Sequence, residues 1–241
     1  MVKGEEGFER ARRETVRYHE ALYASTSLGD AGSWLARPHP LIFEALALMP
    51  DDRPVVAYDL GAGVGRHTVP MIEALPDGSV VHAVDLLASA VRRLEAIPAS
   101  GSTRVLAQQT DLADLEFADG ADLVFAFSAI EHLPDAAEIR KLFAKIAAAV
   151  RPGGVVALGI IADRYEVDQT GTRRPALLES GITVLEAEQL LATSFAGFEA
   201  VRSGTRPASV VEHRGEEEYT LFSTLVIWIG RRSSAPLPAP T

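Results

Sequence analysis

Three glycines at a strand-to-helix turn constrain the fold of this chain more than any other feature of its sequence. The turn reads Asp59-Leu-Gly61-Ala-Gly63-Val-Gly65-Arg66, and it directly follows the apolar run at residues 55–60. A short apolar run that stops at glycines indicates a buried strand. In an open parallel sheet, ligands bind at the carboxyl ends of the strands, and glycines there let the backbone approach a ligand closely. The turn therefore predicts an α/β fold with a ligand site at this strand exit.

The rest of the chain alternates between strand and helix patterns. Further strands are predicted at residues 79–84, 103–107, 122–127 and 155–161, and helices at 67–75, 88–97, 136–150 and 185–195. This alternation favours βαβ units and a parallel sheet. Two later strands, 198–203 and 219–229, are joined by a polar stretch without a helix. We therefore expect a Rossmann-like, mostly parallel seven-stranded sheet with an antiparallel C-terminal hairpin and helices on both faces.

The length of 241 residues, 47% of them hydrophobic, suits one α/β domain, and no Pro/Gly/Ser-rich linker divides the chain. We expect a single domain over residues 1–232. Helical patterns at 5–24 and 39–49 precede the first strand and predict an N-terminal helical lid over residues 1–50. The proline-rich residues 233–241 predict a disordered tail.

Composition argues against several classes of function. The formal net charge of -10 disfavours a nucleic-acid partner, because such enzymes present a basic surface to phosphate. The chain has no cysteine, which excludes thiolate catalysis and cysteine-based zinc sites. No metal is expected, because no ligand-like cluster is formed by His19, His67, His82 and His213. No apolar run reaches the ~20 residues of a membrane helix, and the charged N-terminus does not read as a signal peptide. We expect a cytoplasmic monomer or homodimer that acts on a small molecule.

An acid beside the glycine turn helps to distinguish between two kinds of ligand that such a turn can bind. A dinucleotide motif of the GxGxxG kind would need glycine where Arg66 stands, and it would hold a pyrophosphate at the helix N-terminus. Asp59 would repel a pyrophosphate, but its carboxylate suits a ligand that carries an ammonium and a sulfonium. S-adenosylmethionine (SAM) is such a ligand. A nicotinamide-dependent oxidoreductase is the alternative that this argument disfavours.

Two further acids follow the next two strands. Asp85 could accept hydrogen bonds from both ribose hydroxyls, and Asp111 from the adenine amino group. Each could instead be a turn or helix-capping residue. Acids at three successive strand ends favour the nucleoside interpretation.

Residues 55–161 resemble the class I SAM-dependent methyltransferases. The matching stretches are DLGAGVGR at the glycine turn, AVD at residues 83–85, TDL at 110–112, SAIEHLPD at 128–135 and RPGG at 151–154. In that family the glycine turn faces the methionine part of SAM, the second acid holds the ribose, and the acid-hydrophobic pair after the third strand frames adenine. By this resemblance the cofactor contacts are Gly61, Gly63, Asp85, Leu86, Asp111, Leu112 and Ser128. The charge argument above adds Asp59 to them.

The N-terminal segment is loosely similar to tellurite and thiopurine methyltransferases, a small-molecule subgroup with a helix and loop over the cofactor. By this resemblance Arg37 could meet the SAM carboxylate, while Tyr23 and Trp34 could wall the site. Aromatic faces near a sulfonium are physically sensible, since they attract cations. Alternatively, the two aromatic residues only pack the first helix on the core.

The segment after the fourth strand holds the candidate catalytic residues. His132 could act as a general base if the acceptor must lose a proton, and Glu131 could orient it or point away. His39 and Tyr165 are weaker candidates. His132 could also be a packing residue beneath the cofactor. No Asp/Asn-Pro-Pro-aromatic motif follows this strand, which argues against methylation of exocyclic amines of nucleic-acid bases.

A long segment, residues 162–181, is expected to be an insertion that closes the acceptor pocket. It carries Arg164, Tyr165, Arg173 and Arg174. The arginines are consistent with an acidic acceptor, although they could be surface charges. We expect Trp34, Tyr165 and Arg164 to contact the acceptor. A SAM-binding regulatory protein without transfer activity remains a further alternative.

Overall fold

A computed structural model describes residues 5–118, 120–177, 179–214 and 217–234. One sheet organises them, with strand order β3-β2-β1-β4-β5-β8-β7 and a short β6 paired with β5. The first five strands in this order are mutually parallel: β3 (Arg104–Gln109), β2 (Val80–Asp85), β1 (Val56–Leu60), β4 (Ala121–Phe127) and β5 (Val150–Asp168). β8 (Glu217–Arg232) is antiparallel to both of its neighbours, β5 and β7 (Phe198–Arg214). The predicted fold class is confirmed, with β6 (Arg173–Pro175) as an additional strand.

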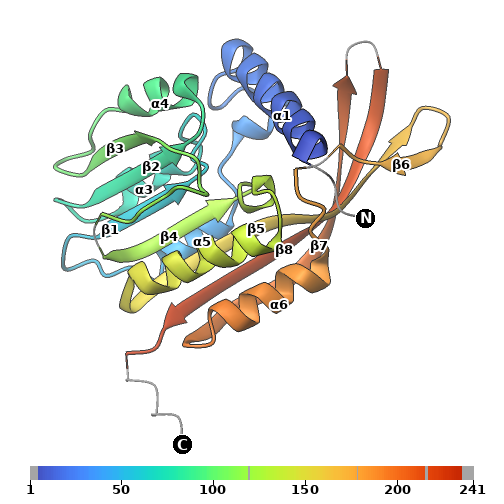
Figure 1. Cartoon of the computed structure of the whole chain (residues 1–241). Helices are drawn as coiled ribbons and strands as arrows, with labels where there is room; N and C mark the ends of the chain where they lie inside the picture. The colour runs from blue at the N-terminus through green and yellow to red at the C-terminus, as the bar shows by residue number, and fades with distance from the viewer. Residues whose placement is uncertain (1–4, 119, 178, 215–216, 235–241) are drawn as a thin grey trace, which may run out of the picture.

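Helices cover both faces of the sheet (Figure 1). On one face, α5 (Ala136–Ala149) and α6 (Val184–Ser194) bury apolar side chains such as Phe143 and Leu190 against β4, β5 and β8. On the other face, α2 (Leu41–Leu46) and α3 (Thr68–Ala74) pack against β1 and β4, and α4 (Ala88–Glu95) packs beside β2 and β3. None of the described helices is long and apolar enough to span a membrane.

Side-chain caps start the two helices of the first face. Asp135 accepts hydrogen bonds from the backbone amides of Ala137 and Glu138, at 2.8 and 3.0 Å, and so begins α5. Thr183 and Glu186 form a reciprocal capping box at the start of α6. These caps determine where α5 and α6 begin, and so where the segments after β4 and β6 end.

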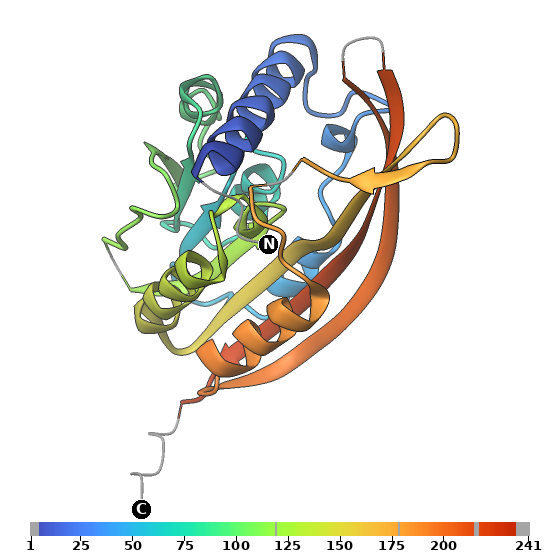
Figure 2. The same cartoon turned by 45° about the vertical axis from the view of Figure 1, so that its right-hand side comes forward.

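The N-terminal segment lies over the carboxyl ends of the parallel strands. It comprises α1 (Glu5–Ser25) and the short 3-10 helix η1 (Trp34–Ala36), and α1 crosses this edge in both views (Figures 1 and 2). Arg93 of α4 ties the end of α1 down, because it donates hydrogen bonds to the backbone oxygens of Tyr23 and Thr26.

Two segments predicted as irregular are strands instead. β5 continues through the supposed insertion to Asp168, and β7 continues through the polar stretch to Arg214. Their polar residues misled the sequence prediction, because an antiparallel strand can expose one face to solvent while its backbone remains paired. A register shift between Ala162 and Tyr165 interrupts the β5–β8 ladder. The long strands curve upward beside α1 (Figure 2). Residues 235–241 of the predicted tail lie outside the described residues.

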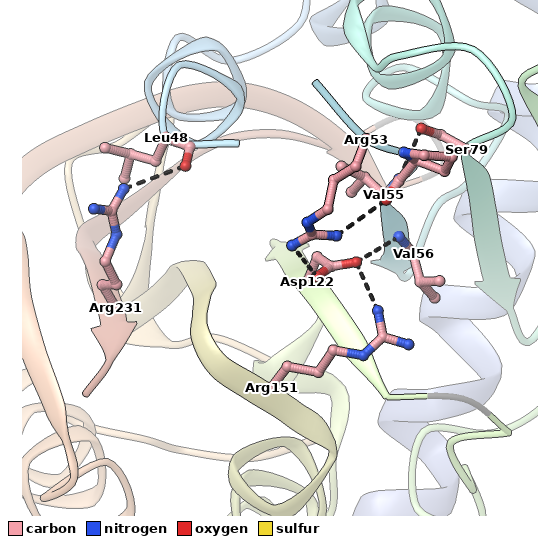
Figure 3. Close-up of polar contacts among 9 residues, drawn as sticks. Leu48, Arg53, Val55, Val56, Ser79, Asp122, Arg151 and Arg231 are labelled. Carbon is pink, nitrogen blue, oxygen red and sulfur yellow. Dashed lines mark hydrogen bonds and ion pairs between the residues drawn. The ribbon is translucent and has the colours of Figure 1, made fainter. Parts of the chain in front are cut away.

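A buried carboxylate ties the opposite edge of the sheet together (Figure 3). Asp122, the second residue of β4, accepts hydrogen bonds of 2.9 Å from Arg53, Arg151 and the backbone amide of Val56. The starts of β1, β4 and β5 are thereby joined, far from the edge that carries the glycine turn.

Candidate functional site

The glycine turn brings bare backbone to the end of β1. Gly61 and Gly63 have φ angles of +69° and +56°, a region that side-chain-bearing residues rarely adopt. A Cβ at Gly61 would contact Ala129 after β4, and a Cβ at Gly63 would lie 2.7 Å from the hydroxyl oxygen of Tyr23. Glycine is therefore required at both positions by conformation and by space.

Asp85 holds this turn from the neighbouring strand. Its buried carboxylate accepts hydrogen bonds from the backbone amides of Gly63 and Leu87, at 2.8 and 2.9 Å. Burial raises the pKa of Asp85, and these amides partly oppose that rise. Leu86, immediately after it, keeps 37% of its surface exposed beside the turn. The predicted ribose-binding acid thus also shapes the glycine turn.

Asp59 is almost completely buried at the end of β1. Its carboxylate accepts a 2.6 Å hydrogen bond from the Thr68 hydroxyl at the start of α3. Burial raises the pKa of Asp59 to about 7, although Thr68 and the charge of Arg66 work in the opposite direction. A cation that reached this carboxylate would favour its ionised form.

Arg66 is a site residue that the sequence analysis treated only as a missing glycine. Its guanidinium carbon lies 4.9 Å from the ring centroid of Trp34 and 5.4 Å from that of Phe127. It donates a 2.7 Å hydrogen bond to the Trp34 backbone oxygen, and burial lowers its pKa to about 10. A basic residue directly after the last glycine of such a turn was the signal that could have identified it.

The acid after β3 has a partner on α1. Asp111 forms an ion pair with Arg12 and accepts a 3.0 Å hydrogen bond from the Ala113 backbone amide. Leu112, its neighbour, is partly buried against the core. Nothing in the local sequence around Asp111 indicated Arg12, which is 99 residues away in the chain.

At the tip of β4, the Ser128 hydroxyl donates a 2.9 Å hydrogen bond to Glu131 Oε1. Ser128 itself has a φ of +52°, which is uncommon for a residue with a side chain. Glu131 is fully buried, and its Oε2 has no hydrogen-bond partner among the described residues. Glu131 therefore points toward Ser128 and does not orient His132.

His132 has a different carboxylate partner. It ends the 3-10 helix η2 (Ile130–His132), and its Nδ1 lies 3.1 Å from Oε2 of Glu179. The His132 side chain keeps 27% of its surface exposed, while Glu179 is 2% exposed. The ring of His19, on α1, stands edge-on to His132 with centroids 6.0 Å apart. Glu179 was missed because it lies 47 residues from His132.

The site residues predicted in the N-terminal segment differ in how deeply they are buried. Tyr23 is buried with its hydroxyl over Gly63, whereas Trp34 is 41% exposed and covers Arg66. Arg37 is exposed at the end of η1. His39 stacks on Phe127 with a centroid separation of 4.2 Å. Burial, together with the charges of three nearby arginines (Arg66, Arg206 and Arg202), lowers the pKa of His39 to about 4.

The long strands carry a hollow of about 530 Å³ next to this region. Arg164, Tyr165 and Arg173 line it together with Phe222, on whose ring Tyr165 stacks at 5.2 Å. The Nη2 atom of Arg164 is buried, and no residue in the described part of the chain forms a hydrogen bond with it.

The other two arginines of the predicted insertion differ in their surroundings. Arg173 remains in the hollow, with its guanidinium carbon 3.7 Å from the centroid of the Tyr165 ring. Arg174 pairs with Glu166 and Glu217, at 3.0 and 2.6 Å. For Arg174 these pairs favour the alternative of a surface charge over a contact with an acidic acceptor.

The strand ends fit a cationic adenosyl ligand. Asp59, Asp85 and Glu131 place three buried carboxylates around the glycine turn, and one oxygen of Glu131 has no partner among the described residues. A buried ionised carboxylate is costly unless a cation or a hydrogen-bond donor meets it. SAM offers an ammonium, a sulfonium and two ribose hydroxyls, which match these acceptors.

Comparison with known proteins shows what part of the chain is similar to. Residues 57–154, less than half of the chain, match the sequence profile of a family described as a methyltransferase domain. The match supports the predicted resemblance to the class I SAM-dependent methyltransferases. It spans the glycine turn, the acids after β2 and β3, and the Ser128–His132 segment.

Two curated methyltransferases are similar to part of the chain. Trans-aconitate 2-methyltransferase of Azoarcus sp. (strain BH72) is 34% identical over 116 residues, which are 48% of this chain and 42% of that protein. Phosphoethanolamine N-methyltransferase 2 of Caenorhabditis elegans is 31% identical over 109 residues, 44% of this chain and 24% of that protein. The chain thus spans less than half the length of either relative.

The fold extends beyond the matched domain. The crystal structure of the N-methyltransferase NodS from Bradyrhizobium japonicum WM9, in complex with S-adenosylhomocysteine, superposes with a TM-score of 0.53 at 14% identity. That likeness covers 90% of this chain and 98% of NodS. The similarity in fold therefore extends over more of the chain than residues 57–154.

Proposed function

We propose that this chain transfers a methyl group from SAM to a small-molecule acceptor. The observation that carries the proposal is the set of buried carboxylates, Asp59, Asp85 and Glu131, around the glycine turn of the methyltransferase domain. A nicotinamide-dependent oxidoreductase would bring a pyrophosphate to this turn, where these acids would repel it.

Each part of SAM has proposed contacts. Asp59, Gly61 and Gly63 face the methionine end, and Tyr23 closes over the turn. Asp85 and Leu86 hold the ribose, Asp111 and Leu112 frame the adenine, and Ser128 lies beside the methyl group. Arg37 remains the proposed partner of the SAM carboxylate, although its exposed position requires the loop after η1 to close. Arg66 is better placed for the same task, because it lies directly after the turn.

When bound, SAM supplies an electrophilic methyl group: the acceptor's lone pair makes the new bond, and sulfur keeps the pair of the broken C–S bond. Such a leaving group needs no acid, so the protein's main contribution is alignment of the acceptor. His132 takes the proton of an acceptor that must lose one. The segment 1–50 acts as a lid that excludes water from this site.

We propose that the acceptor carries an acidic group. Arg164, whose Nη2 has no hydrogen-bond partner among the described residues, lines the hollow together with Tyr165. Trp34 does not line this hollow, and its proposed contact with the acceptor rests on its position over Arg66. The two curated relatives are named for anionic acceptors, trans-aconitate and phosphoethanolamine, which makes these compounds the first to test. We further propose a cytoplasmic monomer or homodimer that does not act on nucleic acid, consistent with the net charge of -10.

Calorimetry with SAM, S-adenosylhomocysteine and NADH tests the proposal. We expect binding of the two adenosyl ligands, and a loss of about 1–3 kcal/mol in SAM binding for Asp85→Ala, the scale of hydrogen bonds to a charged group. A preference for NADH would support the oxidoreductase instead. An acceptor screen that detects S-adenosylhomocysteine release follows, and SAM binding without any turnover would favour a regulatory protein.

A further inference from the structure

The side chain that orients His132 comes from the segment between β6 and α6. Glu179 Oε2 lies 3.1 Å from Nδ1 of His132, and the Ser180 hydroxyl beside it donates a 3.1 Å hydrogen bond to the Glu131 backbone oxygen. Two consecutive residues of this segment therefore form hydrogen bonds with η2. These contacts place residues 179–180 against η2, which the sequence of the segment did not predict.

Glu179 is ionised at neutral pH despite its burial. Burial acts to raise its pKa, but hydrogen bonds from His132 and Thr15 and the charges of His132 and Arg164 outweigh that effect and lower the pKa. An ionised carboxylate only accepts hydrogen bonds, so the proton of a neutral His132 ring must be on Nδ1. The lone pair on Nε2 then remains free to accept a proton.

The same carboxylate is linked to α1. Thr15 donates to Glu179 from that helix, and His19, one turn later, hydrogen-bonds the Thr15 backbone oxygen at 2.9 Å. Burial, followed by the charge of His132, lowers the pKa of His19 to about 4, so His19 is neutral at pH 7. His19 therefore adds no positive charge beside His132, and Glu179 is the charged partner of the His132 ring.

We propose that Glu179 is the positioning residue of the transfer reaction. It selects the Nδ1–H tautomer of His132 and stabilises the imidazolium that forms when Nε2 takes a proton from the acceptor. A carboxylate acceptor is already ionised and needs no base, so this pair indicates an acceptor whose nucleophile bears a proton, a hydroxyl or an ammonium. The acidic group proposed for the acceptor is then its anchor, not its nucleophile. Of the two compounds named above, phosphoethanolamine, with its ammonium, meets this requirement, whereas trans-aconitate does not. This inference rests on the proposed methyl transfer.

Nitrogen-15 NMR of the ligand-free protein tests the geometry without any acceptor. The ring signals of His132, assigned by their loss in His132→Asn, should show the Nδ1–H tautomer. In Glu179→Ala they should move toward the Nε2–H tautomer, whereas Glu188→Gln, an exposed change on α6, should leave them unchanged. An Nε2–H tautomer in the unaltered protein, or no change in Glu179→Ala, would overturn the proposal. Absence of SAM binding by calorimetry would instead overturn the methyltransferase function.

Turnover provides the second measurement. With an acceptor that bears a hydroxyl or ammonium, Glu179→Gln should lower kcat about 10- to 100-fold and leave the Kd of SAM within about twofold. The loss is smaller than the roughly 100- to 10,000-fold contribution of a general base, because His132 itself remains. The acid limb of the kcat profile should move to lower pH, because the imidazolium loses its counter-charge. Glu179→Asp should recover part of kcat. Equal losses of kcat and SAM affinity, with an unmoved acid limb, would identify Glu179 as a structural residue.

Discussion

Arg12, on α1, forms an ion pair with Asp111, at the carboxyl end of β3. The pair joins the proposed lid to the acid expected beside adenine, and both side chains are partly shielded, at 19% and 30% exposure. Because the partners lie on the lid and on the cofactor edge, lid opening must break the pair. SAM exchange should therefore depend on it.

We predict that Arg12→Ala accelerates SAM release. Loss of a partly shielded ion pair is worth about 1 kcal/mol, which corresponds to an increase in koff of about fivefold. Stopped-flow fluorescence can measure this rate. Arg13→Ala is the matched control, since Arg13 only meets the exposed Glu9 at 4.0 Å. Equal koff values for Arg12→Ala and the unaltered protein would show that α1 does not gate the site.

Asp59 should stabilise the bound cofactor and destabilise the ligand-free protein. Its pKa is raised to about 7 from 3.8, so between these values the native state holds a proton that the unfolded state releases. Stability of the ligand-free protein must then fall as pH rises through that window.

Asp59→Asn removes this dependence while keeping an acceptor for the Thr68 hydroxyl. We expect the variant to melt at a higher temperature than the unaltered protein at pH 8, with a smaller difference near pH 4. SAM should bind it more weakly, by about 10-fold or more, because a charged acceptor is lost. Thermal melts across pH and calorimetry at pH 8 measure the two effects. Parallel melting curves at every pH would refute the assigned pKa.

The sequence predicted which site residues lie at the ends of strands, but it did not predict which side chains contact them. Gly61, Asp85, Asp111 and Ser128 were located correctly because parallel strands bring their carboxyl ends to one edge, a rule that needs only local periodicity. Arg12 and Glu179 were missed because each meets its partner only through tertiary packing. The extensions of β5 and β7 were missed for a similar reason: their pairing with β8 compensates for a polar sequence that reads locally as a loop.

The contact of Gly63 with Tyr23 can be measured by a double-mutant cycle. Gly63→Ala should destabilise the protein through its positive φ, which costs on the order of 1–3 kcal/mol, and through the clash with the Tyr23 hydroxyl. Tyr23→Phe removes that hydroxyl, so the double variant should recover at least about 0.5 kcal/mol relative to additivity.

Gly29→Ala is the control for this cycle, because its φ is +91° and no atom lies within 4 Å of its Cβ position. Gly29→Ala and Tyr23→Phe should therefore be additive in urea unfolding. Additivity in the Gly63 cycle as well would mean that α1 does not rest on the glycine turn.

Asp122 should make the fold sensitive to acid at the edge opposite the site (Figure 3). Burial acts to raise its pKa, but Arg53, the Val56 amide and Arg151 outweigh burial and lower it. A carboxyl group with a lowered native pKa contributes stability above its unfolded pKa and loses that contribution as pH falls through the native value. Asp122→Asn should lower the free energy of unfolding by about 2 kcal/mol at pH 7, because three donors lose a charged acceptor. Water can solvate the half-exposed Arg53 and Arg151 in its place, so the Val56 amide carries most of this cost. Urea unfolding should show this cost shrinking below about pH 4, near the ordinary pKa of an aspartate.

Asp51→Asn is the control, because Asp51 is exposed; it should neither lower the free energy of unfolding at pH 7 nor change its pH dependence. If the cost of Asp122→Asn does not depend on pH, then the shape of this side chain, and not its charge, holds the three strand starts together.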